Sequence, residues 1–147
     1  MNRNSLLGSA KKLNQVSEKS FNEYSENSES LIFHINNFMG SNAEIQKLVG
    51  NNDLTIMKTN HTNHVKFMAS IFKQYNPEVF VDTILWAFSA YRNHGFHRKY
   101  FEIQLAAWDD ILSNNLSEES YMEIIPYYEW IIKNIPVCIS ITENQAV

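Results

Sequence analysis

The segment Asn76–Leu112 constrains the fold most, because it contains two apolar helical patterns separated by one glycine, Gly95. An asparagine followed by a proline opens it, a pair that caps a helix and fills its first position without losing a hydrogen bond. Gly95 predicts the end of this helix, since glycine takes the left-handed conformation without steric cost. Tyr91 and Phe96 would then form the apolar contact of a Schellman ending. The sequence therefore predicts a sharp corner between two buried helices.

Apolar residues recur at steps of three and four along most of the remaining chain, which is the spacing of a helix face. Besides the two helices of the corner, the patterns predict helices near residues 31–39, 45–49, 54–75 and 117–135. Only the last few residues suggest the alternation of a strand, and no glycine-rich phosphate loop or internal repeat stands out. We expect an all-α domain of about six helices.

The two ends of the chain differ in composition from the predicted helical domain, residues 29–136. Residues 1–28 are polar and rich in Asn, Ser, Lys and Glu, which favours a frayed arm or a weak helix. Pro136 is expected to end the last helix. Residues 137–147 would follow as a tail that packs on the domain or contributes to an oligomer contact.

Composition narrows the class of protein. Of 147 residues, 44% are hydrophobic and 13% aromatic, which predicts one packed domain and not a disordered chain. A net charge of -4 disfavours a nucleic-acid partner, because phosphates attract a basic surface. The chain shows no signal-peptide pattern and no apolar run of about 18 residues, so we expect no membrane span. With Cys138 as its lone cysteine, the expectation is a soluble cytoplasmic protein.

The corner segment AYRNHGFHRKYFEIQLAAWDDIL resembles the F-to-G helix region of bacterial globin-type sensor domains. Gly95-Phe96 and the aromatic pair Tyr100-Phe101 match that region, and Ile111-Leu112 matches it loosely. Over residues 54–135 the order of predicted helices resembles helices E to H of a globin. The resemblance implies a single globin-like domain with a sensory or signalling role in a bacterial protein.

One position departs from the family pattern. Haem-binding sensors of this kind carry the iron-ligating histidine four residues before the corner glycine, where this chain has Tyr91. His94 stands one residue before the glycine, and His97 lies beyond it. The family includes haem-free members in stress-response signalling complexes, and the missing histidine favours that group. The resemblance therefore implies a non-catalytic module without haem, acting through a protein partner or as a homodimer.

Two alternatives involve a bound group. In the first, haem binds with His94, His97 or Tyr91 as its ligand and with His61 or His64 on the opposite wall, giving a gas or redox sensor. In the second, the chain is a helical bundle that binds a small molecule or a metal. His61 and His64 share a helix face, but no third ligand follows by spacing, so no metal site is predicted. The many aromatic residues could instead enclose a flat apolar ligand.

Catalysis is not predicted. Asp109-Asp110 and Glu118-Glu119 are adjacent carboxylates, which diverge by about 100° on a helix and cannot converge on one substrate atom. Cys138 has no basic neighbour to stabilise a thiolate. No nucleophile elbow is present in the sequence.

Overall fold

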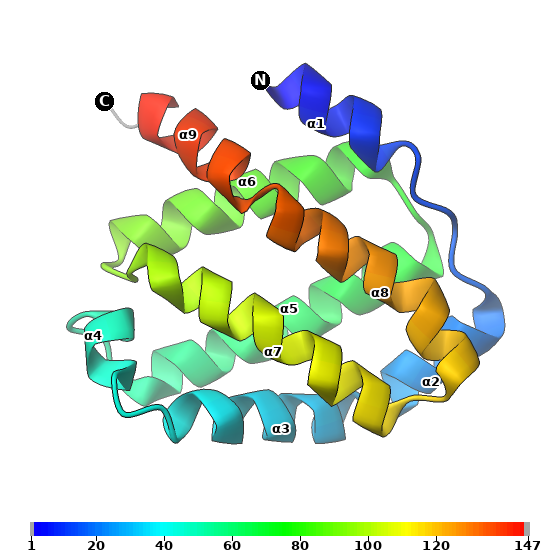
Figure 1. Cartoon of the computed structure of the whole chain (residues 1–147), viewed down its shortest axis with the longest axis horizontal. Coiled ribbons are helices and arrows are strands. Elements are labelled where there is room, and N and C mark those ends of the chain that lie inside the picture. Colours follow the sequence, from blue (N-terminus) through cyan, green and yellow to red (C-terminus); the bar gives the residue numbers. More distant parts are fainter. Residues whose placement is uncertain (1, 146–147) are drawn as a thin grey trace.

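The computed structural model describes residues 2–145, which form nine helices joined by short loops and contain no strand (Figure 1). They are α1 (Arg3–Ala10), α2 (Glu18–Glu26), α3 (Ser28–Gly40), α4 (Ile45–Val49), α5 (Leu54–Lys73), α6 (Pro77–Asn93), α7 (Arg98–Asn115), α8 (Glu118–Lys133) and α9 (Ile135–Gln145). The predicted all-α class is confirmed, with more helices than the expected six. None of these helices is both long enough and apolar enough to cross a membrane.

The packing forms one core around α5 and α7. Helix α3 packs on both α5 and α7, and α8 packs on α7 from another side. Helix α6 contacts α1 and α9, so the first and last helices lie on the same element although they are far apart in the sequence (Figure 1). Buried aromatic side chains, with Trp108 and Tyr128 wholly inaccessible, fill the space between these helices.

The corner at Gly95 forms as the sequence predicts. Gly95 has φ = 92°, and the two hydrogen bonds of a Schellman ending are present: Phe96 N–H to Tyr91 O at 3.0 Å and Gly95 N–H to Arg92 O at 2.9 Å. The rings of Tyr91 and Phe96 lie 5.6 Å apart. Gly50 supports the corner from outside, since a Cβ on it would stand 2.5 Å from the carbonyl oxygen of Gly95.

The expected N-terminal arm is instead two packed helices, α1 and α2. Leu6 is 2% exposed and Tyr24 is inaccessible, so each helix buries an apolar side chain despite its polar composition. Short helices need few such anchors when their caps are satisfied, and Asn2 and Ser17 accept the capping hydrogen bonds. The expected boundary near residue 28 corresponds to no gap, because α3 begins two residues after α2 ends.

The segment between α1 and α2 is fixed by hydrogen bonds to the end of α5. The Gln15 amide N–H donates to Phe72 O at 2.8 Å, and its carbonyl accepts from Tyr75 N–H at 2.8 Å. The Tyr127 hydroxyl donates to Asn14 O. We call residues 14–24, with the α5 and α8 groups that they contact, the N-terminal junction.

Helices α2 and α8 cap each other within this junction. They begin with similar heptapeptides, SEKSFNE at 17–23 and SEESYME at 117–123, a short internal match that was not predicted. The backbone N–H and hydroxyl of Ser17 both donate to the Glu123 carboxylate at 2.9 Å. In return Ser117 donates the same two groups to Glu23 at 2.5 and 2.8 Å. Each glutamate therefore satisfies the start of the other helix.

The C-terminal segment is also helical where a tail was expected. Pro136 does not end a helix but occupies the second position of α9, where a missing N–H is tolerated. The Arg92 guanidinium donates to the hydroxyl and the carbonyl of Thr142, each at 2.9 Å, and so attaches α9 to α6. The final two residues of the expected tail, 146 and 147, lie outside the described part.

Candidate functional site

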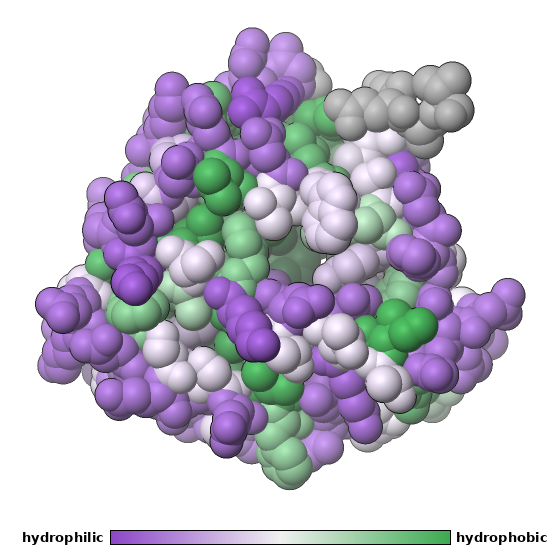
Figure 2. Space-filling view, turned by 180° about the vertical axis from the view of Figure 1, so that it is seen from behind, coloured by the Kyte–Doolittle hydropathy of each residue, from purple (hydrophilic) through white to green (hydrophobic). Residues whose placement is uncertain are grey.

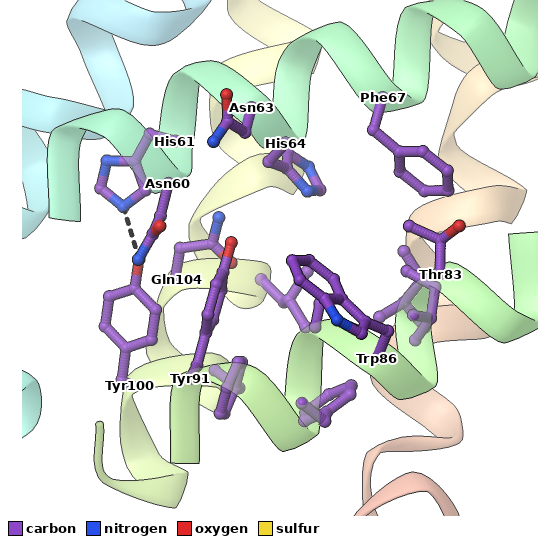
Figure 3. Close-up of a pocket in the computed structure, with 16 residues that line it drawn as sticks. Asn60, His61, Asn63, His64, Phe67, Thr83, Trp86, Tyr91, Tyr100 and Gln104 are labelled. Carbon is purple, nitrogen blue, oxygen red and sulfur yellow. Dashed lines mark hydrogen bonds between the residues drawn. The ribbon is translucent and has the colours of Figure 1, made fainter. Parts of the chain in front are cut away.

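A cavity of about 150 Å³ lies between α5, α6 and α7 (Figure 3). Figure 2 shows a hollow on the face of the molecule from which α5 and α6 are seen. The walls of the cavity are mostly apolar and include Ile84, Phe88, Leu105 and, from α8, Ile131. No Lys, Arg, Asp or Glu side chain is among the residues that line it. The cavity is thus an uncharged, largely apolar chamber.

Trp86 stands at the mouth of the cavity. It lines the cavity although the residue is 66% exposed. The reason is its place on α6: Phe80, Ile84 and Phe88 take the face turned inward, and Trp86 falls outside that face. An exposed indole beside a cavity can report on what enters it.

His61 lines the cavity but has no free nitrogen. Its Nδ1 lies 2.7 Å from the Asn36 side-chain oxygen, and its Nε2 lies 2.8 Å from the Tyr100 hydroxyl. Because Asn36 presents an acceptor, Nδ1 carries the proton, and Nε2 accepts from Tyr100. Burial lowers the pKa of His61 to about 4. His61 is therefore a neutral structural residue whose two hydrogen bonds are both made.

His64 differs from His61 because one of its nitrogens remains available. Its Nε2 lies 3.1 Å from the Tyr128 hydroxyl, which lies 2.8 Å from the Tyr24 hydroxyl. The other ring nitrogen has no hydrogen bond within the described chain. Burial lowers the pKa of His64 to about 3, so the ring is neutral. If the Tyr128 hydroxyl donates to Nε2 of His64, Nδ1 carries the proton and can donate to a ligand. If Nε2 donates to Tyr128 instead, Nδ1 can accept.

Gln104 is the least expected member of the site. It projects from α7 into the cavity and is 6% exposed, yet its amide has no hydrogen bond to any described residue (Figure 3). Among the described residues, the fully buried side-chain N and O atoms without a partner are Trp108 Nε1 and Ser120 Oγ, so the amide of Gln104 is reached from the cavity and is not sealed in the core. The sequence did carry a signal: Gln104 stands among the buried residues Phe101, Leu105 and Trp108 of its helix.

Tyr91, the residue at the family's histidine position, lines the same cavity. Its ring stacks on Phe101 at 5.6 Å, and its hydroxyl has no hydrogen bond within the described residues. Burial raises the pKa of Tyr91 to about 12, so the side chain is a neutral phenol. Tyr91, His64 and Gln104 thus each offer an unpaired polar group to one chamber.

The other two predicted ligands lie elsewhere. His94 ends α6 and His97 caps α7, with its Nδ1 accepting from Lys99 N–H at 3.1 Å. Both side chains are exposed, and neither lines the cavity. The structure therefore brings together Tyr91, His61 and His64 and leaves His94 and His97 at the outer corner.

A cavity of this size does not fit a haem in this conformation. A cavity of about 150 Å³ accommodates one benzene-sized ring, whereas a porphyrin has four. Both nitrogens of His61 are bonded, and iron ligation by Tyr91 would require a phenolate that burial disfavours. A metal site is not supported either, since no group of three or more His, Cys, Asp or Glu among the described residues could hold an ion.

Cys138, the remaining candidate for reactivity, is buried away from the cavity. Burial raises the pKa of its thiol to about 12, so a thiolate is strongly disfavoured at neutral pH. It packs as a core residue of α9.

Comparisons of this chain with models of known protein families, with curated proteins and with solved structures found no match. The chemistry of the cavity is therefore the basis for assigning a function.

Proposed function

We propose that this chain is a non-catalytic sensory module that binds a small uncharged molecule in the cavity between α5, α6 and α7. The observation that carries the proposal is the side chain of Gln104, which is 6% exposed as a residue and turns an amide without a protein partner into the cavity. Such a group is tolerated when a ligand completes its hydrogen bonds. The lining supplies no carboxylate base, which favours binding over catalysis.

The globin-like interpretation is part of this proposal. In support of it, α5, α6, α7 and α8 follow one another in the order expected for helices E to H, with the Gly95 corner between α6 and α7. The cavity is enclosed by the first three of these helices and Ile131 of the fourth. Tyr91 at the histidine position suits a member of the group that has no haem.

A sensory role needs a route from the cavity to another part of the fold. Such a route is the hydrogen-bonded series His64, Tyr128 and Tyr24, which runs from the cavity wall to α2. A ligand that pairs with the free nitrogen of His64 fixes the direction of these hydrogen bonds. We propose that the response passes to a protein partner or to a second copy of the chain; light scattering with and without ligand tests the second copy.

The experiment that tests binding is a titration of the whole chain with benzene, phenol and indole, followed by NMR. We expect saturable binding of at least one probe near one per chain. The Ala87→Leu variant should abolish it, because Ala87 lines the cavity and the larger side chain fills it. Ala106→Leu is the matched control, since Ala106 is exposed on α7. No binding of any probe would refute the proposal, and a stoichiometric haemin spectrum would replace it with the haem alternative.

A further inference from the structure

The polar groups of the cavity restrict the chemistry of the ligand, and not only its size. Gln104 presents an acceptor carbonyl and a donor N–H₂ from one planar group, and neither is used by the described chain. A partner that uses both must carry a donor and an acceptor side by side. An amide held in the cis arrangement by a ring has that edge.

Charge and size restrict the ligand further. No charged side chain lines the cavity, and its two histidines are neutral, so a charged ligand would lose its hydration without a counter-charge. The volume of about 150 Å³ matches a cavity that accepts benzene. Aromatic side chains such as Phe88 and Phe101, whose ring centroids lie 4.4 Å apart, form part of the wall. Flat rings pack well against such a wall.

We infer that the ligand is a neutral single-ring cyclic amide, bound through two hydrogen bonds to Gln104. Its N–H donates to the Gln104 carbonyl, and its C=O accepts from the Gln104 N–H₂. The free nitrogen of His64 and the hydroxyl of Tyr91 are available to further substituents on the ring. This inference rests on the proposed function, because it assigns a chemical class to the ligand of the same cavity.

The test compares three probes on the whole chain by calorimetry and by the NMR signals of the Gln104 side-chain amide. They are 2-pyridone, 4-methyl-2-pyridone and N-methyl-2-pyridone. The two methylated probes are isomers, but only 4-methyl-2-pyridone keeps the ring N–H. We expect 4-methyl-2-pyridone to bind about tenfold more tightly than N-methyl-2-pyridone, since the latter leaves the Gln104 carbonyl unpaired.

A variant separates hydrogen bonding from shape. Gln104→Met keeps the length of the side chain and removes the amide, so it should bind the two methylated probes with equal affinity. Gln46→Met is the matched control, because Gln46 is an exposed residue of α4 outside the cavity and its loss should preserve the tenfold preference.

The outcomes distinguish this inference from the proposed function. Equal affinity of the two methylated probes for the unmodified chain would overturn the cyclic-amide assignment, while their binding would keep the cavity as a ligand site. If neither the pyridones nor benzene, phenol and indole bind, both proposals fail. If Gln104→Met keeps the preference, the amide is not the recognition group and the assignment is wrong.

Discussion

The cavity and the N-terminal junction both hold polar side chains between helices, but most of those at the junction bond to other helices, whereas two of those in the cavity have no protein partner. At the junction, Gln15, Ser17 and Glu23 all bond to groups on other helices or on the segment that follows α5. In the cavity, Gln104 and Tyr91 have no such partner in the described chain. Paired polar groups stabilise a fold, whereas unpaired ones cost stability. The difference fits a junction that stabilises the fold and the proposed role of the cavity in binding.

The largest expected effect is a difference in pH dependence between the two regions. The pKa of His61 falls from 6.5 to about 4 on folding, so below pH 6.5 the unfolded chain takes up a proton that the folded chain does not. The free energy of unfolding should therefore fall by about 3 kcal/mol from this residue as the pH drops from 7 to 4. Urea unfolding at each pH measures it, and His61→Gln should remove this share of the slope and leave the share of His64, whose pKa is also lowered.

The junction should respond only at lower pH. Burial opposes ionisation of Glu23, but the donors of Ser117 outweigh it and hold the pKa of Glu23 below the ordinary 4.5. Its contribution is present above that value and is lost as the pH falls beneath it. Glu23→Gln should thus leave the slope between pH 7 and 5 unchanged. A change of slope between pH 7 and 5 would contradict the expectation that the junction and the cavity respond in different pH ranges.

The second effect is loss of the reciprocal caps. Ser17→Ala and Ser117→Ala each remove a helix cap and a bond to a glutamate of the other helix. Each substitution should cost about 1 kcal/mol, and the double variant about 2 kcal/mol or more, because the sites lie in one junction. Ser113→Ala is a suitable comparison, since its exposed hydroxyl bonds only to Asp110 O of its own helix. If all three Ser→Ala variants lose the same free energy of unfolding in urea, the two capping serines stabilise the fold no more than Ser113 does.

The third effect distinguishes two tyrosines of the cavity wall. Tyr100→Phe leaves the buried Nε2 of His61 without a donor, which should cost about 1–3 kcal/mol. Tyr91→Phe removes a hydroxyl that has no partner in the described chain, so stability should change by less than about 0.5 kcal/mol. Thermal unfolding of both variants at pH 7 measures the difference. A large loss in Tyr91→Phe would mean that its hydroxyl has a structural role.

The extent to which the sequence predicts this structure follows from the range of the interactions. The Gly95 corner and the caps at Asn76 and Ser117 were predictable, because each depends on residues within one or two turns. The order at residues 14–24 was not, since Gln15 bonds to residues 57 and 60 positions away. Local polarity suggests an arm, and only the tertiary partners make it a packed element.

The same distinction applies to the cavity. The spacing of His61 and His64 correctly places them on one helix, but it cannot show that Tyr100 and Asn36 occupy both nitrogens of His61. Volume is also beyond a pattern, because periodicity fixes which faces meet and not how closely they pack. Gln104 was detectable as a polar residue within an apolar face, yet whether it had a partner depended on the helices opposite.

The smallest effect compares two glutamines by the same substitution. Gln15→Met removes three hydrogen bonds of the junction and should destabilise the fold by about 1 kcal/mol, a modest value because the side chain is exposed. Gln104→Met removes an amide with no protein partner that is reached from the cavity, so it should change stability by less than about 0.5 kcal/mol. A loss in Gln15→Met alone, measured by urea unfolding without ligand, would show that only the amide of Gln15 holds the fold. If Gln104→Met is also destabilising, the amide already has a structural role, and its value to a ligand would have to be measured separately through the binding of 2-pyridone.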